Sequence, residues 1–363
     1  MNAFTRLPDL ALRTYGGSVV AANDESFAER EALIRPGPAE FRPHTFGAKG
    51  QVYDGWETRR RREAGHDWAI VRLGMPGVIR GVVVDTAWFR GNYPPYASVE
   101  ACAAEGHPAP EELDGWVEIV PKSPLGGDAA HEFAVTDPRR FTHVRLNIFP
   151  DGGVARLRVH GRVVPDPAFL RGLTVDLAAL ENGGLVTACS DEFYSSPNNV
   201  LAPGLARNQA EGWETARRRD GGNDWLVVAL AGPGRIAVAE IDTTNLKFNA
   251  PGWASLMGID TGHAARTPPG MDTGQAPQDD RQAPLDDGQA PPDDGRALPP
   301  EDDAGRAPLP DDAAWFPLLP KTRLQPDTRH RFRLDDDRRV THVRLDIFPD
   351  GGLARLRLPG TLA

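Results

Sequence analysis

The sequence predicts an all-β protein built from two tandem β-sandwiches. A first observation is that the segment GWETRRRR, residues 55–62, returns as GWETARRR at residues 212–219. A second is that residues 141–161 return at residues 340–360 with sixteen of twenty-one residues identical. A third is that apolar and polar residues alternate over short segments, the period of strands with one buried face. Two copies of one β-rich design therefore follow each other along the chain.

Bulk composition narrows the class of protein. The 363 residues suffice for about two domains of ordinary size. A net charge of −10 argues against a nucleic-acid or anionic-membrane partner, despite the arginine runs. The two cysteines, Cys102 and Cys189, are not equivalent in the repeats, so we expect no shared disulfide or metal scaffold and a reducing cytoplasm. No segment approaches the apolar length of a membrane span, and the N-terminal residues lack the apolar region of an export signal.

The repeats set the expected domain boundaries. We expect an N-terminal lead-in (1–15), a first repeat (16–165), a linker (166–182) and a second repeat (183–363). The second repeat carries an insertion at 264–312 that repeats Ala, Pro, Asp and Gly and has no aromatic residue. Such a segment buries too little apolar surface to offset its ordering entropy, so we expect a disordered acidic loop.

Strands within the repeats follow from alternation. Residues 67–74 place Ala69, Val71 and Leu73 on one face, and a Met-Pro-Gly turn then leads to a second strand at 79–89. Residues 141–148 also alternate, turn at PDGG and return through residues 155–159 with the apolar positions inward. This pattern predicts an antiparallel hairpin in each repeat.

Two arginine clusters stand beside the GWET motif. The clusters are Arg59 to Arg62 in the first repeat and Arg217 to Arg219 in the second. One interpretation is a solvated strand edge whose arginines pair with nearby carboxylates. The other is an anion site, since the arginine fork binds a carboxylate in bidentate geometry. Its candidate binding residues are Arg59, Arg60, Arg61 and Arg217, with Glu57 and Glu214 beside them to orient the guanidinium groups.

Further polar residues are candidates for acid–base chemistry. His66 and Asp67 are adjacent, so they form a working pair only in a loop or bend, and a lone histidine is more often structural. Asp24 opens the first repeat, where a carboxylate forms a turn or serves a site. Asn92 lies in a Pro- and Gly-containing loop, where an amide binds a ureido group or caps a turn.

Several common site motifs are missing from the sequence. It contains no P-loop, GxGxxG, HExxH, CxxC or GxSxG, so nucleotide, zinc-protease and serine-hydrolase functions lack support. Scattered histidines, His44, His66, His143 and His342, are compatible with a divalent metal but specify none. No cofactor is therefore assigned.

Together, YDGWETRRRREAGHDWAIVRLG, VVVDTAWFRGNYPP and the paired THVRLNIFPDGGVARLR segments resemble the allantoicase family. The resemblance covers nearly the whole chain outside the insertion. It implies two jelly-roll modules similar to galactose-binding or discoidin domains. It also implies hydrolysis of allantoate to (S)-ureidoglycolate and urea in allantoin degradation. A homo-oligomer is compatible with the sequence. The second repeat departs from the pattern at Ala216 and Asn223, which leaves open whether both repeats hold a competent site.

Residue roles follow from the chemistry that the resemblance implies. Arg59 to Arg61 would anchor the carboxylate of allantoate, and His66 oriented by Asp67 would transfer protons. Asn92 and Glu57 would hold the ureido amides, and Asp24 and Glu57 are the alternative acid–base carboxylates. Two rival functions are another ureido hydrolase, such as one acting on ureidoglycolate, and a non-catalytic tandem module that binds a small anion or a sugar. The sugar-binding alternative would use an aromatic platform of Tyr93, Tyr96 and Trp253.

Overall fold

The computed structural model describes residues 2–262 and 315–363. The insertion at 264–312, expected to be disordered, lies outside these residues. Over the described residues the chain forms β-strands and short 3-10 helices and no α-helix, which confirms the all-β class. In the same residues no helix is long and apolar enough to span a bilayer. The 3-10 helices are η1 (Ala3–Arg6), η2 (Arg13–Tyr15), η3 (Arg30–Ile34), η4 (Pro110–Glu112), η5 (Pro167–Phe169), η6 (Leu180–Asn182), η7 (Pro197–Leu201) and η8 (Gln209–Glu211).

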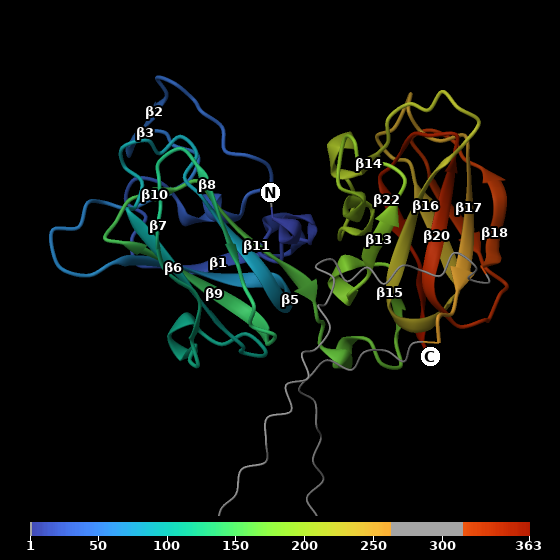
Figure 1. Cartoon of the computed structure of the whole chain (residues 1–363), viewed down its shortest axis with the longest axis horizontal. Helices are drawn as coiled ribbons and strands as arrows, with labels where there is room; N and C mark the ends of the chain where they lie inside the picture. Colours follow the sequence, from blue (N-terminus) through green and yellow to red (C-terminus); the bar gives the residue numbers. More distant parts are fainter. Residues whose placement is uncertain (1, 263–314) are drawn as a thin grey trace, which may run out of the picture.

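The first repeat folds as a β-sandwich (Figure 1). Its larger sheet has the strand order β1-β5-β9-β6-β7, and strands β8 and β11 pair with the C-terminal half of β5 in the second layer. A short pair, β4 with β10, closes one end. The strands are β1 (Ser18–Ala22), β2 (Phe46–Gly47), β3 (Gly50–Gln51), β4 (Trp56–Glu57), β5 (Asp67–Asp85), β6 (Tyr96–Cys102), β7 (Val117–Pro124), β8 (Ala130–Ala134), β9 (Arg140–Phe149), β10 (Gly153–Val154) and β11 (Arg156–Val163).

The second repeat has the same architecture. Its larger sheet runs β12-β23-β15-β20-β17-β18, with β13 also paired to β15. Its smaller sheet runs β19-β16-β22, and β14 pairs with β21 as β4 pairs with β10. The strands are β12 (Thr174–Asp176), β13 (Leu185–Cys189), β14 (Trp213–Glu214), β15 (Asp224–Ile236), β16 (Val238–Asp242), β17 (Trp253–Ile259), β18 (Phe316–Arg323), β19 (Arg329–Arg333), β20 (Val340–Phe348), β21 (Gly352–Leu353), β22 (Arg355–Arg357) and β23 (Pro359–Leu362). The prediction of two tandem β-sandwiches is therefore confirmed.

Strand β5 passes from one sheet into the other. Its N-terminal half pairs with β9 from Asp67 opposite Ile148, and its C-terminal half pairs with β11 from Asp85 opposite Arg156. The expected Met-Pro-Gly turn is wrong, because the chain bends there without reversing and only the register shifts. Glycine is required at position 77, since a Cβ there would lie 2.0 Å from the Arg162 carbonyl oxygen.

The predicted hairpin at residues 141–159 is also wrong. Strands β9 and β11 both pair with β5, in different halves, and not with each other. The PDGG segment instead crosses the end of the sandwich, where Gly153 and Val154 pair with β4. The expected inward positions Ala155, Leu157 and Val159 are nevertheless fully buried.

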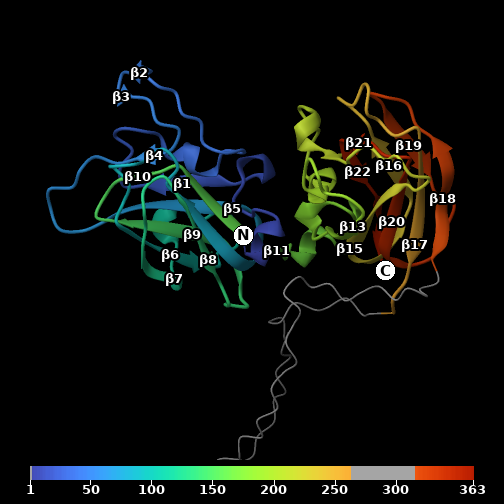
Figure 2. The same ribbon diagram turned by 45° about the horizontal axis from the view of Figure 1, so that its top comes forward.

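The two modules lie side by side, and the N-terminal segment lies on the face of the first module that looks toward the second (Figures 1 and 2). Arg6 in that segment forms an ion pair with Glu192 of the second module, 2.9 Å between Nη2 and Oε1. The core is continuous across both modules. In the expected lead-in Leu10 is fully buried, and in the expected linker β12 pairs with β23. Both segments thus fold with the repeat that follows them.

Candidate functional site

A cavity of about 410 Å³ opens at the end of the first module, beside strands β4 and β10. We call it the arginine cavity; its lining residues are Asn23, Asp24, Arg59, Arg60, Arg61, Arg62, Glu63 and Asp67. The segment after β1, the arginine run after β4 and the first residue of β5 all contribute to it. The fold therefore brings together Asp24, the arginine run and Asp67, which the sequence had marked separately.

The GWET motif fixes the position of the arginine run. Trp56 is fully buried, and its indole Nε1 donates to the Asp24 carbonyl oxygen at 2.8 Å. Gly55 has no room for a side chain, since a Cβ would lie 2.6 Å from the ring of Phe89. The Thr58 hydroxyl accepts a hydrogen bond from the backbone NH of Gly152 at 3.1 Å. The motif therefore ties the arginine run to the core of the module.

Asp24 is a fully bonded carboxylate. Its Oδ1 accepts from the backbone NH of Ser26 and of Arg59, both at 3.0 Å, and its Oδ2 pairs with Arg59 Nε at 2.8 Å. Burial by itself raises the pKa of Asp24, but these hydrogen bonds and the Arg59 charge outweigh it and hold the pKa below its ordinary value. Asp24 is therefore an anion at neutral pH that orients Arg59.

Asp67 holds the second fixed arginine. Its Oδ1 accepts from Arg61 Nη1 at 2.6 Å and from the Asn23 amide at 2.8 Å. The Arg61 backbone NH donates to Asp151 Oδ2 at 2.8 Å, so the main chain and the side chain of Arg61 are both anchored. Arg61 Nε is buried and has no hydrogen-bond partner among residues 2–262 and 315–363. One donor of an otherwise fixed guanidinium is thus left unused.

Arg60 and Arg62 differ from their neighbours. Both are exposed, and neither has an ion pair in the part of the chain that the structure describes. With Arg59 and Arg61 neutralised by Asp24 and Asp67, these two outnumber the one remaining carboxylate of the lining, Glu63. The cavity consequently favours a small anion.

Glu57 and Asn92 pair with each other. The Asn92 amide donates to Glu57 Oε1 at 2.6 Å. Burial raises the pKa of Glu57 above its ordinary value, and the hydrogen bond from Asn92 only partly opposes this. Glu214 and Asn249 repeat the pair in the second module at 2.5 Å. Neither Glu57 nor Asn92 lines the arginine cavity.

His66 and Asp67 do not form a pair. The His66 ring packs against the ring of Phe149, with 4.7 Å between centroids, whereas Asp67 turns to Arg61 and Asn23. Lys122 Nζ lies 4.3 Å from the centroid of the Phe149 ring. His66 therefore lies beside an aromatic ring that also contacts a lysine. It is adjacent in sequence to Asp67 of the cavity lining, but it does not line the cavity itself.

The second module places its candidates differently. Arg217, the counterpart of Arg60, is exposed, and the Glu214 carboxylate also accepts from Gln209 Nε2 at 2.5 Å. Asn223, the counterpart of His66, donates to Asp346 Oδ1 at 3.0 Å. Its amide cannot exchange protons near neutral pH.

Neither a metal centre nor an aromatic platform forms in the described residues. Among the described residues no group of three His, Cys, Asp or Glu side chains could hold a metal ion. The proposed aromatic platform does not form, because Tyr96 and Trp253 occupy equivalent places in different modules and Tyr93 packs beside Phe89.

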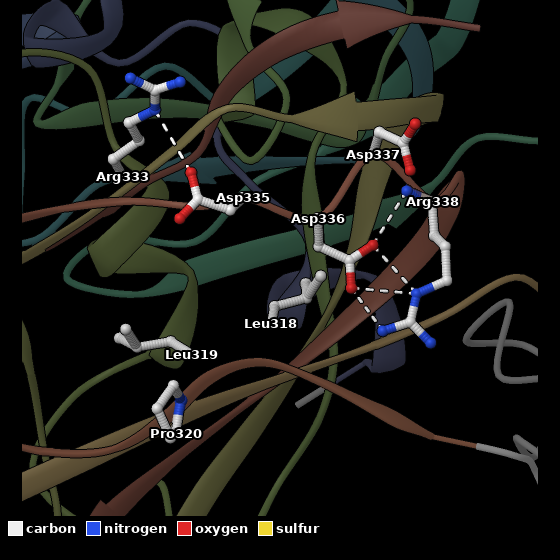
Figure 3. A pocket seen from close by; sticks show the side chains of 8 residues that line it. All are labelled: Leu318, Leu319, Pro320, Arg333, Asp335, Asp336, Asp337 and Arg338. Atoms are coloured by element: carbon white, nitrogen blue, oxygen red, sulfur yellow. Dashed lines mark hydrogen bonds and ion pairs between the residues drawn. The ribbon is translucent and has the colours of Figure 1, made fainter.

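A hollow of about 610 Å³ lies in the second module, away from these residues (Figure 3). Arg333 there pairs with Asp335 at 3.4 Å between Nε and Oδ1, and Arg338 pairs with Asp336. Since its arginines are already matched by adjacent carboxylates, this hollow does not offer the unpaired charge of the arginine cavity.

Sequence reasoning missed Asn23, Asp151 and Glu63. Asn23 and Asp151 hold Asp67 and Arg61 in place, and Glu63 lines the cavity. A signal existed for Asp151, because PDGG recurs in the second repeat and Asp350 binds the Arg218 backbone there in the same way.

The fold and the candidate site define a tandem β-sandwich protein with an arginine-lined cavity in its first repeat. The family model "Allantoicase repeat" matches residues 8–164 and 175–363. A "Probable allantoicase" of Nocardia farcinica is 50% identical over 366 residues, covering 99% of this chain and 96% of that protein. Another, from Streptomyces coelicolor, is 48% identical and covers 99% of this chain and 86% of that protein. The crystal structure of allantoicase from Saccharomyces cerevisiae superposes with a TM-score of 0.72 at 33% identity, covering 98% of this chain and 93% of that chain. The chain belongs to the allantoicase family.

Proposed function

We propose that this protein hydrolyses allantoate to (S)-ureidoglycolate and urea, a step of purine degradation. The observation that carries the proposal is the arginine cavity, which has two fixed arginines and two without an ion pair in the described structure. The chain that contains it is 50% identical to a probable allantoicase over 366 residues. Cys102 and Cys189 are not joined in a disulfide, which suits a reducing compartment, so we place the activity in the cytoplasm.

The carboxylate of allantoate is the natural ligand of this cavity. Allantoate carries one carboxylate and two ureido groups on a single methine carbon. Arg59 and Arg61 are held by Asp24 and Asp67, which lowers the entropy lost when they bind an anion. Arg60 supplies the charge that no carboxylate among the described residues neutralises. The carboxylate therefore orients the methine carbon with respect to the surrounding loops.

Proton transfer falls to groups beside the cavity. The leaving ureido nitrogen gains a proton and the attacking water loses one, tasks that suit a group titrating near neutral pH. His66 is one candidate because an imidazole exchanges protons near neutral pH, and Glu57 is the other because burial raises its pKa. Asp24 and Asp67 act instead by positioning Arg59 and Arg61. The Asn92 amide already donates a hydrogen bond to Glu57. Asn92 would therefore bind a ureido amide of the substrate together with Glu57 and not alone.

Urea release by the purified chain tests the proposal. We expect urea from allantoate and none from ureidoglycolate. Urea from ureidoglycolate alone would identify a different ureido hydrolase, and urea from neither, with intact β-structure by circular dichroism, would favour a binding module.

A further inference from the structure

Arg61 and Arg218 occupy equivalent positions and are anchored alike. The Arg61 backbone NH donates to Asp151 and that of Arg218 to Asp350, each at 2.8 Å. Nη1 of Arg61 lies 2.6 Å from Asp67 Oδ1, and Nη1 of Arg218 lies 2.8 Å from Asp224 Oδ1. The two guanidinium groups are thus fixed along one edge by the same pair of contacts.

The opposite edges of the two guanidinium groups differ. In the second repeat Asp220 binds the opposite edge of the Arg218 guanidinium in bidentate fashion, with 2.9 Å from Nε to Oδ1 and 2.9 Å from Nη2 to Oδ2. The backbone NH of Gly222 also donates to Asp220 Oδ1 at 2.9 Å. Three donors therefore converge on one carboxylate, the arrangement that proteins use to bind a carboxylate ligand.

The first repeat leaves this edge without a carboxylate. Glu63 takes the place of Asp220 in the first repeat, where it is exposed and forms no ion pair with Arg61. Arg61 Nε is buried without a partner among the described residues, and a buried unpaired donor is costly. The segment Arg62–Gly65 over it is exposed throughout, so no core packing holds that segment against an incoming ligand.

We propose that the second repeat contains a closed copy of the anion site, in which the carboxylate of Asp220 is a built-in ligand. The same geometry assigns a place to the substrate in the first repeat: its carboxylate binds Nε and Nη2 of Arg61 and the backbone NH of Gly65. This second statement rests on the proposed function, whereas the first rests on the contacts of Asp220 alone.

An internal carboxylate excludes external ones by its effective concentration. Asp220 is tethered two residues from Arg218, so an external anion competes with a ligand present at an effective millimolar concentration or higher. The hydrogen bond from Arg218 and that from the Gly222 NH hold the pKa of Asp220 below its ordinary value, so the ligand stays charged at neutral pH. The chain therefore has one open carboxylate site, not two.

Replacement of Asp220 tests the closed site. The probe is ureidoacetate, which has the carboxylate and one ureido group of allantoate, and the measurement is its binding stoichiometry by calorimetry on the full chain. We expect one site per chain in the wild type and two in Asp220→Ser, with the second site lost again in Asp220→Ser/Arg218→Ala. Asp335→Ser, which removes the exposed partner of Arg333 elsewhere in the second repeat, is the control and should keep one site.

Each outcome separates the two statements. One site in both the wild type and Asp220→Ser would overturn the closed-site proposal. No site in the wild type but one in Asp220→Ser would support the closed site and overturn the substrate position in the first repeat. The Asp220 side chain is 65% exposed, so its loss should spare the fold. If the serine variant fails to fold, Asp220→Gly serves. A rise in melting temperature with ureidoacetate that is larger in this variant than in the wild type supports the closed site, and an equal rise in the two proteins overturns it.

Discussion

Arg61 and Asp67 form an ion pair, 2.6 Å between Nη1 and Oδ1, in which the carboxylate is 2% exposed and the guanidinium 25% exposed. The pair links the arginine run to the first residue of strand β5. One side of the pair faces the cavity and the other belongs to the core, so substitutions here affect stability as well as binding.

Arg61→Ala should therefore destabilise the protein. Removing the arginine leaves a buried carboxylate with Asn23 as its remaining partner, at a cost of about 2 to 4 kcal/mol. Denaturant unfolding measures this cost. In Arg61→Ala/Asp67→Ala most of the loss should be recovered, and a double variant as unstable as the sum of the single ones would show that the pair is not coupled.

Arg60→Ala should weaken substrate binding without destabilising the protein. Arg60 is exposed and unpaired in the described structure, and a charge-assisted contact is worth about 1.5 to 3 kcal/mol. KM should rise by roughly ten- to a hundredfold. Arg217→Ala, at the equivalent place, should leave KM unchanged. Equal KM values for both variants and the wild type would make the arginine run a solvated edge.

Glu57→Gln should lower kcat by about two to four orders of magnitude if Glu57 transfers a proton. Glu214→Gln is the matched control and should have little effect. The raised pKa of Glu57 also contributes stability below its ordinary pKa, and this contribution is lost as the pH rises through the folded-state pKa. Glu57→Gln should therefore flatten both the rate profile and the stability profile in that range. A profile identical to that of the wild type would exclude Glu57.

His66→Ala should lower kcat by about two to four orders of magnitude at nearly constant stability, because an imidazole exchanges protons near neutral pH. Asn223→Ala should cost much less. Urea release across pH 5 to 9 is the measurement, with circular dichroism as the control for folding. Small and equal effects of the two substitutions would remove His66 from the mechanism and leave Glu57 as the candidate.

His143 should make the protein sensitive to acid. Burial, assisted by the charge of Arg72, lowers its pKa from 6.5 to about 4, so the folded state binds its proton less readily than the unfolded chain. The resulting stability is present above pH 6.5 and is lost as the pH falls toward 4, by about 3 kcal/mol. His143→Gln should remove this pH dependence, measured by unfolding at pH 4 to 7, and substitution of the exposed His107 by Gln is the control. An unaltered pH dependence in His143→Gln would falsify the assignment.

The sequence predicted those features that depend on local period or on internal repetition. Alternation placed Ala69, Val71 and Leu73 in the core, and the repeats located the two modules. The partner of a strand could not be predicted this way: β9 and β11 are both amphipathic, and only closure of the sandwich selects β5 for each. The same limit applied to the candidate site, whose residues could be predicted but not their partners. Its arginines were evident, but the partner of Asp67 depends on loops that meet only after folding.

The passage of β5 through both sheets has a consequence for how the first module unfolds. Amide protons of residues 67–72 are protected by one layer and those of residues 78–85 by the other, yet both groups lie on a single unbroken strand. Detaching either layer disrupts the strand on which the other depends. The two layers should thus exchange their amide protons with solvent as one cooperative unit, at the free energy of global unfolding, while the exposed segment 62–65 exchanges far sooner.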